Sequence, residues 1–157
     1  MITGIDTAAP VVVRRAITID AALSRVWALH TDVPSWPSWQ PDITAARSGG
    51  PLAPGSVFHW STAGLDIAST VYAVEAPFRI LWGGPAHGIT GVHQWTFRTV
   101  DSAVDGTVDG SADGMVRVET EESWDGDPVR TDVEAMRAAL DGSLAAWLDH
   151  LKRAAER

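Results

Sequence analysis

The spacing of apolar residues near the start of the chain changes from strand-like to helix-like. Residues 11–19 are mostly β-branched, which predicts a strand. Asp20 can cap a following helix, and apolar residues recur at helical spacing over residues 22–30. Residues 32–41 contain three prolines, so they predict a short turn or a single helical segment rather than a long helix.

The middle of the chain alternates between apolar and polar residues, with Gly, Pro or Asp turns between the segments. This pattern is typical of consecutive antiparallel strands. The predicted strands, the first of them weaker than the others, cover residues 43–47, 57–61, 67–75, 78–82, 91–100 and 115–124. The connection 101–114 repeats Asp-Gly three times, but a spacing of four without a closing Glu argues against a calcium loop. It predicts a long solvated hairpin loop instead.

The C-terminal segment has the clearest helical pattern. Thr131 and Glu134 have the spacing of a capping box, which places Thr131 at the N-cap of a helix that runs to about Ala155. Apolar residues between Val133 and Leu151 then form one stripe along that helix. Gly142 lies within the stripe, where a missing side chain would let a neighbouring group or a ligand approach the backbone closely.

The order of these elements predicts an α+β fold. The antiparallel sheet and the last helix each have an apolar face, and the simplest way to bury both is a curved sheet of about seven strands closed around the helix. Two short helical segments follow the first strand. The length of 157 residues fits one domain, residues 1–157, with residues 1–10 as a flexible tail.

Tryptophan is unusually frequent in this chain. There are eight Trp residues but only three Phe and one Tyr. Six of the indoles lie in or beside apolar segments: Trp39, Trp60, Trp82, Trp95, Trp124 and Trp147. A small core with so many large rings is either over-packed or built around a hollow. Hollows lined by aromatic rings and a few polar groups bind small apolar molecules, so the composition predicts a ligand cavity.

Charge and missing motifs narrow the function classes. Twenty acidic residues against twelve basic ones give a formal charge of −8, which argues against nucleic acid and anionic membranes as partners. No apolar run is long enough for membrane insertion, and the N-terminus lacks a signal-peptide pattern, so we expect a cytoplasmic protein that is a monomer or homodimer. With no cysteine, no metal-like histidine spacing and no nucleotide fingerprint, no metal and no cofactor are expected.

Several separated motifs together resemble the START-like, or SRPBCC, superfamily. The resemblance begins with residues 17–29, the Trp-Pro-Ser-Trp of residues 36–39 and the Pro-Asp-Ile of residues 41–43. Later segments resemble its polyketide cyclase/dehydrase branch in sequence order: 64–70, 81–84, 88–89, 93–97 and 120–124. The resemblance implies a helix-grip fold with a deep apolar cavity between the sheet and the C-terminal helix. The sequence departs from it in the Asp-Gly-rich connection and in Ala22, where relatives often carry proline.

Strand alternation places one polar pair on the inner face of the sheet. His93 and Phe97 share the more apolar face of one strand, and Val118 and Glu122 share a face of the next. If the two strands form a hairpin with Phe97 opposite Val118, His93 lies opposite Glu122 with Cβ atoms about 5 Å apart. A register shift of two residues would separate the pair.

The predicted pair has two interpretations. As a catalytic pair, Glu122 would fix the tautomer of His93 and raise its pKa, and the two groups could move protons in an aldol cyclisation or dehydration. As a structural pair, the two side chains would satisfy each other and anchor neighbouring strands. We further expect the ligand to contact Trp39, Trp60, Trp82, Trp95, Trp124, Met136 and Leu140.

Two functions remain open from the sequence. One is a cofactor-independent cyclase or dehydratase for an aromatic or polyketide-like substrate, and the other is a non-catalytic carrier or sensor of a lipid-like metabolite. Relatives that are cyclases often present an inward Arg or Tyr to the substrate carbonyl, whereas Tyr72, Arg98 and Arg117 are expected to face outward here, which weakens the enzyme hypothesis. A co-chaperone-like role has no charged partner-binding segment to support it.

Overall fold

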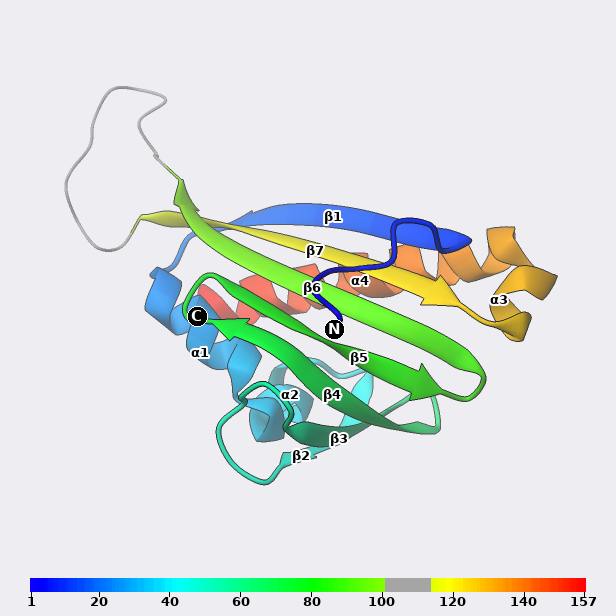
Figure 1. The fold of residues 1–157 in the computed structure, drawn as a ribbon. Coiled ribbons are helices and arrows are strands. Elements are labelled where there is room, and N and C mark those ends of the chain that lie inside the picture. Colours follow the sequence, from blue (N-terminus) through cyan, green and yellow to red (C-terminus); the bar gives the residue numbers. More distant parts are fainter. Residues whose placement is uncertain (101–113) are drawn as a thin grey trace.

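Seven strands form one antiparallel sheet that curves around a long helix in the computed structural model, which describes residues 1–100 and 114–157 (Figure 1). The strands follow the order β1-β7-β6-β5-β4-β3-β2 across the sheet. Their bounds are β1 (Val11–Ile19), β2 (Ile43–Ser48), β3 (Val57–Thr62), β4 (Leu65–Glu75), β5 (Arg79–Ala86), β6 (Ile89–Val100) and β7 (Met115–Asp125). The predicted sheet and its strand sequence are confirmed.

The helices lie on the concave side of the sheet and at its ends (Figure 1). They are α1 (Leu23–Thr31), the 3₁₀ turn η1 (Val33–Ser35), α2 (Trp36–Trp39), α3 (Asp127–Thr131) and α4 (Val133–Ala155). Arg25 of α1 donates hydrogen bonds to the carbonyl oxygens of Ala154 and Ala155 at the end of α4. A cation at a helix C-terminus stabilises both its unpaired carbonyls and its dipole, so this contact ties the two helices together.

Strand β5 is longer than its sequence pattern predicts. The expected strand ends at Trp82, because the Gly-Gly-Pro that follows is typical of a turn. In the structure, pairing with β6 continues to Ala86 opposite Ile89, and Pro85 lies opposite Thr90 close to the hairpin turn. The hydrogen-bonding partner strand therefore extends a segment whose local composition favours a turn.

Both predicted helix caps are wrong. Ala22 precedes α1 without a side-chain cap, and the Asp20 carboxylate plays no capping role there. Thr131 belongs to the short helix α3, and the N-cap of α4 is Asp132, whose side chain accepts a hydrogen bond from the Ala135 N–H at 3.2 Å. Helix α4 therefore begins one residue later than predicted, and Ala135 rather than Glu134 occupies its N3 position, because the chain makes a separate helical turn immediately before α4.

The N-terminal residues cross the face of the sheet opposite α4 (Figure 1). Arg79 donates a hydrogen bond to the Thr3 carbonyl oxygen at 2.7 Å, and the Asp6 N–H donates to the Ser123 hydroxyl at 2.9 Å. These contacts attach the start of the chain to strands β5 and β7. The connection with repeated Asp-Gly pairs lies outside the described residues, except for Gly114.

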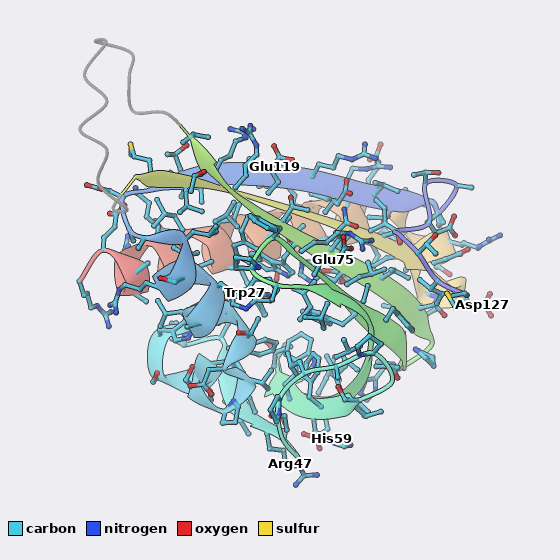
Figure 2. The ribbon with its side chains drawn as sticks, turned by 60° about the vertical axis from the view of Figure 1, so that its left-hand side comes forward. Trp27, Arg47, His59, Glu75, Glu119 and Asp127 are labelled. Atoms are coloured by element: carbon cyan, nitrogen blue, oxygen red, sulfur yellow. The ribbon has the colours of Figure 1, made fainter. Side chains whose placement is uncertain are left out.

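The main core lies between the concave face of the sheet and the helices. In Figure 2 the Trp27 side chain lies between α1 and the sheet, and its ring packs edge-on against Phe97 at a centroid distance of 5.5 Å. Arg47 and His59, paired across β2 and β3, project into solvent at the edge of the sheet. A second apolar cluster contains Val11, Val13, Val129, Leu140 and Leu144, with Met136 packed against it.

Replacing Asp132 with Ala should lower the free energy of unfolding by about 1 kcal/mol, because the first turn of α4 loses its side-chain acceptor. The matched variant Thr131→Ala removes only an exposed hydrogen bond to the Asp127 carbonyl oxygen and should change stability by less than about 0.5 kcal/mol. Urea unfolding of both variants measures the difference. If Thr131→Ala lowers the free energy of unfolding more than Asp132→Ala does, Thr131 is the N-cap of the helix.

Candidate functional site

A cavity of about 310 Å³ lies between the inner face of the sheet and α4. Its wall is mostly apolar, with strands β3 to β7 on one side and Leu140, Ser143, Leu144 and Trp147 of α4 on the other. The polar side chains near its mouth are Asp42, Thr62 and His87, and those deeper in the wall are Ser69, His93 and Glu122. This volume accommodates a small aromatic molecule.

Four indoles form much of the cavity wall: Trp60, Trp82, Trp124 and Trp147. Trp60 is held in place by its N–H, which donates to the Ser69 hydroxyl at 3.0 Å. Trp60 meets Trp82 and Trp147 edge-on, with centroid distances of 5.8 Å and 6.1 Å. Edge-to-face contacts are favourable for aromatic rings but do not fill space as stacked rings do, so these rings pack against one another beside an open volume.

Three residues expected at the ligand lie elsewhere. Trp95 is fully buried behind the wall, with its ring 5.1 Å from that of Trp147. Trp39 contacts the other side of Trp147 and borders a separate surface depression, while Met136 packs into the second apolar cluster. Strand alternation and helical spacing assign a residue to a face of its element, but depth along that face depends on what packs against it.

His93 and Glu122 occupy directly opposite positions on β6 and β7, as the register predicts. The His93 Nδ1 lies 3.0 Å from Glu122 Oε1, and the His93 Nε2 lies 2.7 Å from the Thr120 hydroxyl oxygen. The Trp124 N–H donates to Glu122 Oε2 at 2.5 Å. These four side chains form one hydrogen-bonded chain along the inner face of β6 and β7.

Burial controls the charge of this pair. It raises the pKa of the Glu122 carboxyl to about 8, although the hydrogen bond from Trp124 opposes the shift. Burial also lowers the pKa of His93 well below its ordinary value, and His30 lowers it further. The expectation that Glu122 raises the pKa of His93 is therefore wrong, because loss of solvation outweighs the attraction between the two groups. Both groups are neutral at pH 7.

In the neutral pair, the carboxyl proton of Glu122 can reside on either of its two oxygens. If it resides on Oε1, Glu122 donates to His93 Nδ1, and His93 Nε2 donates to Thr120. If His93 carries its proton on Nδ1 instead, Thr120 donates to Nε2, and the acid proton resides on Oε2. The Thr120 hydroxyl serves both arrangements because a hydroxyl both donates and accepts.

Oε2 is the oxygen beside the cavity lining. A Cβ atom placed on Gly91, which lines the cavity opposite Trp124, would lie 3.4 Å from Oε2. Glycine at this position therefore leaves open the space through which a ligand reaches the carboxyl group. With its proton on Oε2, Glu122 can donate a hydrogen bond to a ligand oxygen while still accepting from Trp124.

The sequence prediction missed three residues of the site: Thr120, Gly91 and Ser69. Thr120 lies on the same face as Glu122 by strand alternation, so parity was the signal that could have identified it. Gly91 had no comparable signal, because its role depends on the distance between two strands. Gly142, expected to admit a close neighbour, has no atom from another described element within 4 Å of where a Cβ would lie.

Arg98 and Arg117 face away from the cavity, as their strand positions predict. Arg98 is exposed, and Arg117 pairs with Glu119 at 2.9 Å on the outer face, where Figure 2 labels Glu119. Tyr72 occupies an irregular position between Val71 and Ala73 and does not line the cavity. Among residues 1–100 and 114–157, no cluster of three or more His, Asp or Glu side chains is arranged to hold a metal ion.

Comparison with known proteins places the chain in a family. The family model described as polyketide cyclase/dehydrase and lipid transport matches residues 10–156, so the chain belongs to this family. No curated protein matches the chain. In the part of the chain that the structure describes, no helix has the length and apolarity needed to cross a membrane.

Solved structures share the fold at low sequence identity. A hypothetical protein from Helicobacter pylori has a TM-score of 0.78 and 18% identity over 99% of this chain and 98% of its own. A START superfamily protein from Mycobacterium smegmatis has a TM-score of 0.74 and 11% identity, covering 92% and 97%. The ZhuI aromatase/cyclase from a Streptomyces species has a TM-score of 0.73 and 16% identity, covering 93% of both chains. These similarities confirm the helix-grip architecture.

Stability should reveal the protonated state of Glu122. Because its pKa of about 8 in the folded protein exceeds the ordinary value of 4.5, the folded state keeps a proton that the unfolded chain releases. The free energy that Glu122 contributes to folding therefore falls as pH rises from about 5 to 8, by up to about 1.4 kcal/mol per pH unit. Relative to the wild type, Glu122→Gln should become progressively more stable across this range in urea unfolding.

The control for this measurement is Glu119→Gln, which changes an exposed glutamate on the outer face of the same strand. Its stability difference from the wild type should stay nearly constant with pH. If Glu122→Gln and the wild type show parallel pH profiles, then Glu122 is ionised in the folded protein at neutral pH and its assignment as a neutral acid fails.

Proposed function

We propose that this protein binds an aromatic or polyketide-like small molecule in the Trp-lined cavity and that Glu122 and His93 catalyse its cyclisation or dehydration by acid-base chemistry. The observation that carries the proposal is a buried carboxylic acid, neutral at pH 7, in the wall of an apolar cavity. Family membership and the fold shared with an aromatase/cyclase support the substrate class.

The neutral acid suits the chemistry of such a substrate. A ketone oxygen in the cavity would accept a hydrogen bond from the Oε2–H of Glu122. As the enol carbon of the substrate attacks this ketone, Glu122 would transfer its proton to the oxygen, and a C–C bond and a hydroxyl group would form. The enol O–H proton would return to the carboxylate, so the acid is regenerated and no net charge stays buried.

In this proposal His93 acts through Glu122. Both ring nitrogens of His93 already have partners, and only about 5% of its side chain is exposed, compared with about 15% for Glu122. His93 therefore orients the carboxyl group and provides a nearby site for its proton, whereas Glu122 contacts the substrate. Thr120 supports the imidazole from its other nitrogen.

A second candidate is a carrier or sensor that holds such a ligand without turnover. The outward positions of Arg98 and Arg117 favour it, because among the described lining residues no cationic side chain faces the cavity to stabilise an enolate. The same neutral Glu122 would then select ligands that carry a hydrogen-bond acceptor. Binding and turnover experiments separate the two candidates.

Binding should depend on a ligand carbonyl and on the Glu122 proton. Fluorenone and fluorene have similar shapes and differ in one carbonyl group, so quenching of Trp fluorescence at pH 6 should show about tenfold tighter binding of fluorenone. This advantage should disappear as pH rises above about 8, when Glu122 ionises. In Glu122→Gln it should persist without pH dependence, because the amide still donates, and in Glu122→Ala it should vanish.

Glu119→Gln again provides the control and should behave like the wild type. Equal affinities for the two ligands in the wild type at pH 6 would show that Glu122 does not donate to a ligand. Failure of both ligands to bind the wild type at all would count against an aromatic-binding cavity.

Turnover distinguishes the enzyme from the carrier. If the protein is a cyclase, incubation with a poly-β-ketone should give a cyclised product by mass spectrometry, and Glu122→Gln should lower the rate at least about 100-fold. His93→Ala should also lower it, by a loss in kcat. If native mass spectrometry instead finds an apolar compound retained unchanged, with turnover undetectable in the wild type, the carrier function is supported.

A further inference from the structure

His30, at the end of α1, is a buried imidazole surrounded by aromatic rings. Its side chain is about 1% exposed, and neither ring nitrogen has a hydrogen-bond partner among the described residues. The ring lies 4.3 Å from Trp95, 5.5 Å from Phe97 and 5.9 Å from both Trp36 and Trp147, measured between centroids. An apolar residue would satisfy this environment better than a histidine does.

The neighbouring Trp95 also has a buried polar atom without a hydrogen-bond partner in the described residues. Its indole N–H is buried and also lacks a partner within the described part of the chain. Buried polar atoms without partners are costly, and native proteins hold few of them. Two such groups in direct ring contact, both directly behind the cavity wall, indicate a place where a ligand supplies the missing partner.

Trp147 separates this pair from the cavity. Its ring lines the cavity on one side and lies 5.9 Å from His30 and 5.1 Å from Trp95 on the other. The His30 and His93 rings both contact Trp95, at 4.3 Å and 5.0 Å, so their centroids are at most about 9.3 Å apart. A ligand of two or three joined rings is long enough to span this distance, and it can reach the pair only if the Trp147 ring rotates.

We propose that His30 and Trp95 form a second polar contact for the ligand, which binds a hydroxyl group at the end of the molecule remote from Glu122. The hydroxyl would accept a hydrogen bond from the Trp95 N–H and donate one to the unprotonated ring nitrogen of His30. This inference rests on the proposed function, because it extends the same binding site inward past Trp147.

The charge state of His30 fits a neutral hydroxyl group. Burial lowers its pKa to about 3, so the imidazole is neutral across the physiological pH range. A neutral imidazole donates from one nitrogen and accepts at the other, which matches a group that does both. A carboxylate would bring an unpaired charge into an aromatic enclosure, where burial is far more costly.

Flavone and the flavone that carries one para hydroxyl on its phenyl ring test this contact. Each has a ketone for Glu122, and they differ only in the remote hydroxyl. In the wild type, titration should show at least tenfold tighter binding of the hydroxylated ligand. This advantage should be lost in His30→Leu and at least partly retained in His30→Gln, which keeps a donor and an acceptor.

A matched control is His59→Leu, which makes the same change at an exposed position on β3 and should preserve the full hydroxyl advantage. His30→Leu should also unfold at a higher temperature than the wild type, because it removes two unpaired polar atoms from the core. If His30→Leu fails to fold, ¹⁵N NMR of His30 in the wild type provides a second readout, and its ring resonances should shift on binding the hydroxylated flavone only.

The outcomes separate this inference from the proposed function. Failure of both flavones to bind overturns both. Binding of both flavones with equal affinity, or a hydroxyl advantage that survives in His30→Leu, leaves the proposed function intact and shows that His30 is only a packing residue.

Discussion

Trp147 packs between α4 and the concave sheet, and the cavity and its polar groups lie around this indole. Its indole projects from α4 into a set of rings contributed by the sheet and by α2, with centroid distances of 5.0 Å to Trp36 and 6.3 Å to Trp82. This one side chain fixes how deeply the helix lies in the sheet. Trp36 meets this ring edge-on at 74°, whereas Trp82 is tilted at 39°, and this mixed packing attaches the helix to the sheet while leaving a cavity beside it.

The polar part of the site is shaped by the same packing. Rings on both sides exclude water from the His93–Glu122 pair, and this loss of solvation keeps both groups neutral. A salt bridge in that position would hold two buried charges, whereas the neutral pair holds one transferable proton. The apolar wall therefore creates both a space for a hydrophobic ligand and an acid whose proton is available at neutral pH.

The shared fold explains the architecture but leaves the chemistry to the site. Solved structures with the same architecture are 11–18% identical to this chain in the comparisons above, and one architecture can host unrelated activities. What distinguishes this chain is its particular set of inward groups. The Glu122 carboxyl group accepts a hydrogen bond from Trp124 and lies beside Gly91, and the His93 imidazole contacts its other oxygen. The arginines of the same strands face outward.

The succession of strands and the pairing of His93 with Glu122 could be predicted from the sequence, because alternation assigns each residue to a face and matching the apolar faces of two strands sets their register. The sequence did not determine which indoles face the cavity. Trp60 and Trp95 both lie on inward faces, yet one lines the cavity and the other is buried behind Trp147. The charge of Glu122 was equally hidden, since solvation depends on every group packed around the carboxyl. Only the tertiary structure decides depth and solvation, because both are properties of surfaces brought together from distant parts of the chain.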